Sequence, residues 1–247
     1  MMTQSCLITG ASSGIGKALA QHYAAQGWTV YAVARSEDKL NELKQSHQIN
    51  ALPLDLTDTA ALKHCAQRLQ SAGVALDLVL LNAGTCEYVD AEDLDLAAFE
   101  RTFALNVQSV VAATKFFLPL LKRSDKPQLA IVSSMAHFFP FTRAEAYGSS
   151  KAAISYFADS LRLDLSDSNI SVCLIEPGFV DTPLTQKNEF AMPFLVSVDD
   201  AAKRIYSGLM SGKQRLRFPR RLSFTLQLLG SLPYSWRNAL AKRMKQS

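Results

Sequence analysis

The amino-acid sequence predicts an α/β fold, a single-domain, doubly wound parallel sheet of about seven strands with helices on both faces. Apolar runs of strand length alternate with amphipathic stretches of helical length. The runs are apolar at nearly every position, which is typical of strands that are covered on both faces. The first run leads directly into a glycine-rich turn and a helix, the pattern of a Rossmann-like fold.

The alternation gives an expected position for each element. Strands are expected at Ser5–Thr9, Trp28–Ala34, Ala51–Leu54, Leu78–Leu81, Gln128–Val132, Ser171–Ile175 and Arg215–Phe218. Helices are expected at Ile15–Gln26, Glu37–Gln45, Thr59–Ser71, Ala97–Leu120, Ala144–Ser166 and Val198–Met210. Asp58 and Ser197 precede two of these helices and can cap them. Residues 1–218 should form the cofactor-binding and catalytic domain, with 219–247 as a basic, amphipathic extension of the same domain.

Composition limits the classes of function. Of the 247 residues, 48% are hydrophobic, enough for a sizeable core. The net charge of +4 is unevenly distributed, because the segment from Lys213 onward contains nine basic residues and no Asp or Glu. This excludes a uniformly basic nucleic-acid-binding domain. The chain passes from Met1 almost directly into its first strand, so a cytoplasmic location is expected. Four cysteines without paired spacing are expected to be reduced thiols, namely Cys6, Cys65, Cys86 and Cys173.

The glycine-rich turn predicts a phosphate site. A strand that runs into such a turn and then a helix directs backbone N–H groups and the positive helix end at an anion. The spacing is Gly-x-x-x-Gly-x-Gly, which differs from the commoner Gly-x-Gly-x-x-Gly of dinucleotide folds. The residues expected at a pyrophosphate are Gly10, Ser12, Ser13, Gly14, Ile15 and Gly16.

The residues that follow the second, third and fourth strands should contact the adenosine half of the dinucleotide whose pyrophosphate the turn binds. Arg35 follows the second strand, where an acidic residue would repel a 2′-phosphate, so NADP(H) is favoured over NAD(H). A solvated surface arginine is the alternative. Asp55, followed by Leu56, can accept from the adenine amine or can instead close a turn. After the fourth strand, small residues let the backbone approach the cofactor closely: Asn82, Ala83 and Gly84.

Tyr147 and Lys151 form the strongest candidate for acid/base chemistry. Residues four apart share one face of a helix, so an ammonium can stand beside a phenol. A free tyrosine has a pKa of about 10, and a pKa of ~7 requires about 4 kcal/mol of differential stabilisation. We expect Lys151 to lower the pKa of Tyr147 by favouring its phenolate. Ser134 lies thirteen residues before Tyr147.

These motifs resemble the short-chain dehydrogenase/reductase family in its classical single-domain form. The resemblance covers about residues 3–218 and rests on Thr9 to Gly16, Asp55, Asn82-Ala83-Gly84, Asn106, Ser134, Tyr147, Lys151, Pro177-Gly178 and Thr182, all in the family's order. The chain departs from the family at Leu81, where a second asparagine is common. It also departs in the tail beyond Phe218, which exceeds the usual compact ending.

The resemblance implies roles for the central residues. Tyr147 would be the general acid and, in reverse, the base. Lys151 would hold the hydroxyls of the nicotinamide ribose, and Ser134 would hydrogen-bond the substrate oxygen. Asn106 would support a water relay behind Lys151.

The resemblance also implies the nicotinamide end of the cofactor site. Pro177-Gly178 would turn the chain over the nicotinamide ring. Thr182 would reach the carboxamide, and the backbone of Val180 would add a contact to it. No metal is expected.

Two stretches are expected to line the substrate cleft, residues 135–141 and Leu184–Val196. Both are rich in aromatic and apolar side chains, which favours a lipophilic carbonyl compound or alcohol. His137 is expected to be a loop residue. Core packing or a subunit interface would equally explain these stretches.

The tail has an apolar patch, Leu222–Leu229, between basic residues. It suits peripheral contact with an anionic membrane, or a helix that closes over the active site or packs on a second subunit. A homodimer or homotetramer is expected. The leading function is hydride transfer between NADP(H) and a carbonyl or secondary alcohol. The alternatives are an NADP-binding redox sensor without turnover and a membrane-docked scaffold.

Overall fold

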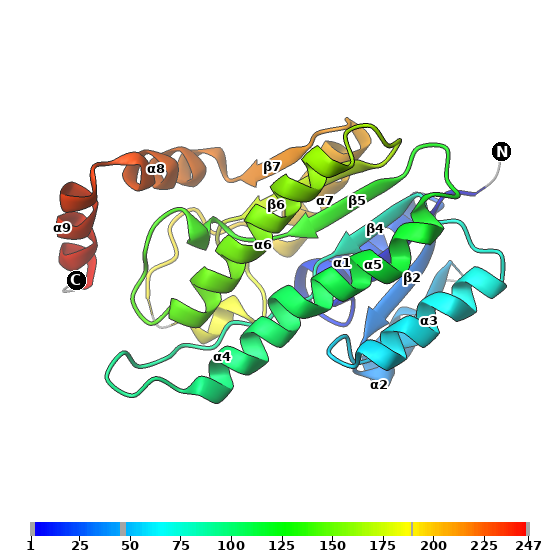
Figure 1. The fold of residues 1–247 in the computed structure, drawn as a ribbon, viewed down its shortest axis with the longest axis horizontal. Coiled ribbons are helices and arrows are strands. Elements are labelled where there is room, and N and C mark those ends of the chain that lie inside the picture. Colours follow the sequence, from blue (N-terminus) through cyan, green and yellow to red (C-terminus); the bar gives the residue numbers. More distant parts are fainter. Residues whose placement is uncertain (1–2, 45–47, 189, 246–247) are drawn as a thin grey trace.

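A computed structural model gives the fold and describes residues 3–44, 48–188 and 190–245. Within these residues, seven parallel strands form one sheet in the order β3-β2-β1-β4-β5-β6-β7 (Figure 1). The strands are β1 Ser5–Thr9, β2 Thr29–Ala34, β3 Ile49–Pro53, β4 Leu78–Leu81, β5 Gln128–Val132, β6 Ser171–Pro177 and β7 Arg215–Phe218. The order reverses between β1 and β4, and ligands of such sheets bind outside the carboxyl ends of the strands at that point.

Helices cover both faces of the sheet, which confirms the predicted fold class. Helices α1, α2 and α7 pack on one face, and α3, α5 and α6 pack on the other. The helices are α1 Gly14–Ala25, α2 Glu37–Leu43, α3 Thr59–Ser71, α4 Leu96–Phe103, α5 Ser109–Leu121, α6 Glu145–Asp164, α7 Val198–Met210, α8 Arg220–Ser231 and α9 Tyr234–Lys245.

Most expected elements agree with the structure to within a few residues. Asp58 accepts from the Ala61 N–H at 2.9 Å and Ser197 accepts from the Asp200 N–H at 3.2 Å, so both predicted caps are confirmed. Strand β6 extends past its expected end, through Glu176, to Pro177. Met1, Gln45 at the expected end of the second helix, and Ser247 lie outside the described residues.

The helix expected at Ala97–Leu120 is divided by a turn of π-helix, η1, at Ala104–Gln108. The whole stretch Leu96–Leu121 has the length and a mean hydropathy of 1.4 that could suit a membrane span. However, Phe117 and Leu120 are completely buried against the sheet. The stretch is therefore the core helix of one sheet face.

The tail packs on the body of the molecule beside the carboxyl end of β7. Figure 1 shows α8 continuing outward from β7 and α9 turning beside the segment before α6. Leu222 and Leu226 of α8 are buried with Met135 and Phe139, the residues that follow Ser134. Because β7 is parallel to the other strands, its continuation starts at the same sheet edge as their carboxyl ends. The extension thus packs on the rest of the chain through a small hydrophobic cluster of its own.

Leu222→Ala should destabilise the protein by about 2–4 kcal/mol, because it leaves a cavity between α8 and the segment after Ser134. Leu222 is 6% exposed, and its Cδ2 lies 2.7 Å from where a side chain on Gly178 would begin. The matched control is Leu228→Ala on the same helix, where the side chain is 54% exposed and the expected change is under ~0.5 kcal/mol. Urea unfolding measures both, and equal losses would contradict the packing of α8.

Candidate active site

A cleft of about 660 Å³ opens at the carboxyl ends of the strands. It is lined by nearly every residue predicted for the site. These are Gly10, Ser12, Ser13, Gly14, Ile15, Arg35, Asp55, Leu56, Asn82, Ala83, Gly84, Ser134, Tyr147, Lys151, Pro177, Gly178, Val180 and Thr182. Gly16 and Asn106 lie behind its wall. Residues spread over more than 170 positions of sequence therefore meet in one hollow.

Close packing explains the glycines of the loop between β1 and α1. Gly10 has φ +69°, and a side chain there would begin 2.9 Å from Ala83 Cα. One on Gly16 would begin 2.2 Å from the Gly10 carbonyl oxygen, so α1 rests directly on the turn. Ser13 caps α1 without a side-chain hydrogen bond, so its hydroxyl and the N–H groups of the first turn remain available. The loop is thereby suited to hold a phosphate.

Arg35 and Asp55 lie together at the other end of the cleft. The pKa of Asp55 is lowered chiefly by the backbone N–H of Thr57, which donates to Asp55 Oδ1 at 2.9 Å. The charge of Arg35, which is exposed, lowers it to a smaller extent. The Thr57 hydroxyl also donates to Asp55 Oδ1 at 2.7 Å. Asp55 therefore closes a turn, as one of its two predicted roles requires, and its adenine contact stays a prediction.

Lys151 is the most buried charged group of the cleft, with 4% of its surface exposed. Its Nζ donates to the Val132 carbonyl oxygen at 3.1 Å and lies 5.7 Å from the centre of the Tyr147 ring. A side chain on Gly84 would begin 3.3 Å from Nζ, so only glycine fits there without a shift. The shared helix face of Tyr147 and Lys151 is thus confirmed.

The electrostatic expectation for this pair is wrong for the cofactor-free protein. Burial raises the pKa of Tyr147 well above its ordinary value, and the hydrogen bond with Ser134 offsets this only partly. Burial also lowers the pKa of Lys151 to about 8, so the side chain is still mostly protonated at pH 7 and loses its proton near pH 8. For both side chains the largest cause of the shifted pKa is the penalty of removing the charged form from water. Tyr147 is therefore a neutral phenol, the form that can donate a proton.

Buried serines tie α6 to the end of β5. The Ser133 hydroxyl donates to the Lys151 carbonyl oxygen at 2.9 Å and lies 2.7 Å from Ser155 Oγ. Ser134 Oγ accepts from the Ala136 N–H at 3.1 Å, which starts the short helix η2, Met135–His137. Sequence reasoning missed Ser133 and Ser155, because a buried serine pair has no distinctive pattern in the chain.

Asn106 lies in the π-helical turn and is buried beside Gly84 and Lys151. Its Oδ1 accepts from the Thr85 N–H at 2.8 Å, and its Nδ2 donates to the Thr85 carbonyl and to Ser150 Oγ, both at 2.9 Å. These bonds tie the segment after β4 to α6. Single π-helical turns often accompany functional sites. The side chain thus positions its neighbours, and the water relay stays a prediction.

The segment after β6 closes the cleft over the glycine loop. Thr182 lies against the loop, since a side chain on Gly14 would begin 3.2 Å from Thr182 Cγ2. The Thr182 N–H donates to Thr185 Oγ1 at 3.0 Å, and the Thr185 hydroxyl also donates to the Val180 carbonyl at 2.5 Å. Both predicted residues are therefore held at the cleft, and their contacts with a nicotinamide remain predictions.

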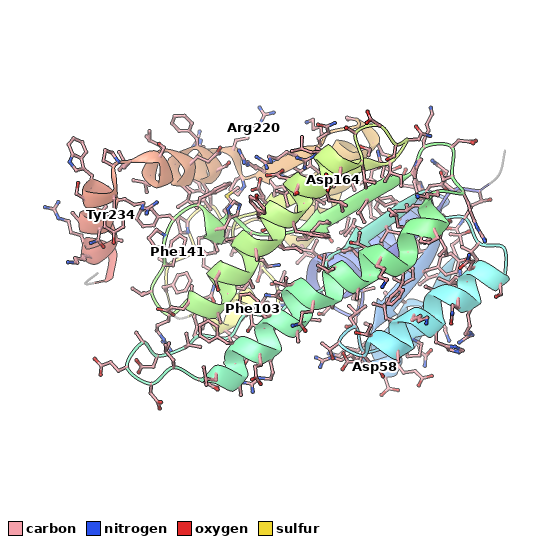
Figure 2. All side chains as sticks on the ribbon, viewed as in Figure 1. Asp58, Phe103, Phe141, Asp164, Arg220 and Tyr234 are labelled. Carbon is pink, nitrogen blue, oxygen red and sulfur yellow. The ribbon has the colours of Figure 1, made fainter. Side chains whose placement is uncertain are left out.

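The two expected substrate stretches differ in position. Met135 and Phe139 are buried under α8, and Phe141 lies beside the tail helices (Figure 2). Core packing, the alternative explanation, therefore accounts for this stretch, and none of its described residues lines the cleft. In the second stretch Leu184 and Thr185 line the cleft, while Phe190 and Phe194 are exposed. Glu189 lies outside the described residues.

A buried ionic network that the sequence analysis missed joins this region to the sheet edge. Glu176 in β6 is 0% exposed, and its carboxylate accepts from His137 Nε2 at 2.7 Å and from Arg217 Nε at 2.6 Å. Burial raises the pKa of Glu176, but these two bonds together with the charges of Arg217 and Arg215 outweigh it and leave the pKa lowered. Arg217 NH1 donates to Gln227 of α8 at 2.5 Å. The network positions the helix after Ser134.

Other reactive groups are few in the part of the chain that the structure describes. No three His, Cys, Asp or Glu side chains there come together as metal ligands. The four cysteines are free thiols. Burial raises the pKa of Cys86, beside the cleft, to about 11, so this thiol is not an activated nucleophile.

A family model described as short chain dehydrogenase matches residues 4–192, and the chain belongs to the short-chain dehydrogenase/reductase family. An oxidoreductase of Myxococcus xanthus is 33% identical, over 99% of each chain. Estradiol 17-beta-dehydrogenase 2 of Rattus norvegicus is 36% identical over 72% of this chain, which spans about half (49%) of that enzyme.

Solved structures share the fold. A family member from Burkholderia phymatum in complex with NAD has a TM-score of 0.83 at 19% identity, covering 92% of each chain. A serine dehydrogenase with NADP+ has a TM-score of 0.79 at 23% identity, covering 87% of this chain and 94% of its own. The protein is thus an oxidoreductase of a family that binds nicotinamide cofactors.

Lys151→Met should raise the melting temperature at pH 7 by at least ~2–4 °C, the shift that ~1 kcal/mol gives at this chain length. The folded protein holds the pKa of Lys151 at about 8, below the unfolded value of 10.5, so below pH 8 folding carries the full cost of the buried ammonium. The parent regains this stability between pH 8 and about 10.5, and the difference should shrink there.

The control for this substitution is Lys203→Met, which removes an exposed ammonium from α7. Thermal unfolding of the three proteins from pH 6 to pH 10 gives the comparison. A parent that is more stable than Lys151→Met at pH 7 would show that the ammonium is not costly to bury.

Proposed function

We propose that the protein transfers a hydride between NADP(H) and a lipophilic carbonyl compound or secondary alcohol, with Ser134, Tyr147 and Lys151 as its acid/base site. The observation that carries the proposal is the buried Lys151 beside a neutral Tyr147, in a cleft that Ser134 and the phosphate loop also line. Burying an ammonium with only one hydrogen bond costs free energy, and groups held at such a cost in a cleft are typical of functional sites.

The residues divide the work of carbonyl reduction. The bound nicotinamide supplies the hydride. Tyr147 gives its phenolic proton to the carbonyl oxygen as negative charge develops there, and Ser134 donates a hydrogen bond to the same oxygen. Lys151 binds the ribose hydroxyls and stabilises the phenolate that remains. In the oxidation direction, the phenolate takes the proton back.

The preference for NADP(H) is supported by Arg35. Its exposed guanidinium stands at the cleft end beside Asp55 without a recorded ion pair among the described residues. A guanidinium binds a phosphate through charge-assisted hydrogen bonds, which a ribose hydroxyl cannot match.

A lipophilic substrate is supported by the segment that borders the cleft. Leu184 lines the cleft, and Phe190, Phe194 and Leu195 further along the segment are exposed. The estradiol dehydrogenase among the relatives carries the name of a lipophilic secondary alcohol. Residues 135–141 do not support a lipophilic substrate, because they pack under α8.

We further propose a cytoplasmic homo-oligomer. Exposed apolar side chains on the outer faces of α5 and α6, Val111, Tyr156 and Leu163, support a subunit contact. The outer face of the tail, with Phe224, Leu228, Tyr234 and Trp236 exposed among basic residues, supports peripheral contact with anionic membranes.

The alternative function, an NADP-binding sensor, needs only the phosphate end of the cleft. NADPH oxidation with a panel of hydrophobic ketones distinguishes enzyme from sensor.

Tyr147→Phe should lower turnover by at least ~10² while NADPH binding stays nearly unchanged, because the hydroxyl transfers a proton and does not hold the cofactor. NADPH oxidation at 340 nm and fluorescence titration of NADPH measure the two effects. Tyr156→Phe, an exposed tyrosine on the same helix, is the control and should keep full turnover. Retention of most activity in Tyr147→Phe would remove Tyr147 as the acid.

Arg35→Ala should erase most of a preference for NADPH over NADH, because it removes the cation expected to meet the 2′-phosphate. Lys39→Ala on α2 removes a nearby exposed cation that does not line the cleft and should leave the preference unchanged. Titration of each protein with both cofactors gives the ratio of affinities. Equal affinities in the parent would contradict the assignment to NADP(H).

A further inference from the structure

A second hollow, of about 450 Å³, lies between β7 and α8 on the outer side of the molecule. Its lining residues do not overlap with those of the dinucleotide cleft. They are Lys213, Arg215, Leu216, Arg217, Arg220, Ser223, Phe224 and Gln227. Figure 2 shows Arg220 at the outer edge of the molecule, where β7 continues into α8. We call this hollow the basic concavity.

The basic concavity holds more positive than negative charge. Four cationic side chains line it, and two carboxylates contact them: Asp159 pairs with Arg215, and Glu176 pairs with Arg217 and lies 3.6 Å from Arg215 Nε. Arg162 shares Asp159 at 2.6 Å, which increases the excess. Among the described residues no ion pair is recorded for Lys213 or Arg220. At least two positive charges therefore face solvent without a counter-ion.

Two of the four cationic groups come from alternate positions of β7. Arg215 and Arg217 stand two residues apart in β7, so they project from the same face of the sheet edge, and Lys213 lies just before the strand begins. Arg215 and Arg217 are also held in place by Asp159 and Glu176. A planar guanidinium that is already fixed loses little conformational entropy when it binds an anion.

Helix α8 adds to the same side. It has twelve residues, begins at Arg220, and its cap, Pro219, offers no side-chain hydrogen bond to the first turn. The first turn of the helix contains no acidic residue, so the positive end of its dipole is not neutralised there. Phe224, 71% exposed, forms an apolar rim, and Ser223 and Gln227 add polar groups.

We propose that the basic concavity is a binding site for a phosphate-bearing anion. A doubly charged phosphate matches the two uncompensated cations, with Arg220 and Lys213 as its principal contacts and Arg215 and Arg217 as fixed neighbours. Phe224 provides an apolar surface for the group that carries the phosphate. The same chemistry can come from a free phosphorylated small molecule or from the headgroup of an anionic lipid.

The site links to the active-site segment through Arg217. This side chain lines the concavity and also holds Glu176, whose other oxygen accepts from His137 in the helix that follows Ser134. An anion that binds Arg217 therefore contacts a side chain that is connected, through Glu176 and His137, to the short helix that follows Ser134. Lys213 and Arg220 contribute only to binding the anion.

The test uses the full chain saturated with NADP+, so that the dinucleotide cleft is filled. Inorganic phosphate is added in place of chloride, so that the ionic strength stays constant, and the melting temperature is measured at each phosphate concentration. The variant is Lys213→Gln with Arg220→Gln, two exposed side chains without recorded ion pairs. The charge-matched control is Lys63→Gln with Arg68→Gln, two exposed cations on α3. Single Arg220→Gln serves if the double variant does not fold.

A second arm identifies the source of the phosphate by co-sedimentation with vesicles that contain phosphatidylserine. We expect phosphate to stabilise the parent and the control, and to bind at least ~10-fold more weakly to Lys213→Gln/Arg220→Gln. Loss of vesicle binding in the same variant supports a lipid headgroup, and a phosphate effect without vesicle binding supports a free ligand. If neither probe distinguishes the parent from this variant, the site does not exist.

Discussion

Burial of Lys151 is the constraint on which the candidate site depends. An ammonium held at 4% exposure with one hydrogen bond, to the Val132 carbonyl, is expensive, and burial lowers its pKa to about 8. The surrounding structure holds it there in spite of the cost. Ser133 fixes the backbone of Lys151, and Gly84 leaves the space that its Nζ occupies. The site therefore has one protonation-sensitive group that a bound anionic cofactor can stabilise, beside a phenol that remains neutral until then.

Two different solutions to buried charge occur within this fold. Glu176 is fully buried, but His137 and Arg217 bond it directly, so it stays ionised and positions the helix after Ser134. Lys151 lacks such a partner among the described residues and is held in a state that favours loss of its proton. The first arrangement is typical of a structural ion network, whereas the second is typical of a functional group. The extension at α8 joins the structural network through Gln227 and covers the aromatic residues beside it.

Local patterns predicted the strands, the glycine turn and the Tyr147/Lys151 face, because each depends on residues that are neighbours along the chain. The π-helical turn at Asn106 was not predictable, since an apolar helical pattern does not reveal one extra residue in a turn. Glu176 was missed because its partners, His137 and Arg217, are about forty residues away on either side. The aromatic residues 135–141 were expected at the substrate cleft, but α8 covers them, and sequence alone does not show which apolar surfaces meet. The pKa of Tyr147 was expected to fall, yet burial, which depends on the whole fold, raises it.

Proton uptake on cofactor binding tests the central claim most directly. Calorimetric titration of NADP+ into the protein at pH 8, in two buffers of different ionisation enthalpy, gives the number of protons exchanged. With a pKa of about 8 in the free protein, Lys151 is half protonated at that pH, and an anionic ligand beside it should raise its pKa. Uptake of up to about half a proton is expected for the parent, fading toward pH 6 and absent in Lys151→Met. Binding without any proton exchange at pH 8, or equal uptake in Lys151→Met, would contradict the assignment of Lys151 as the protonation-sensitive group of the site.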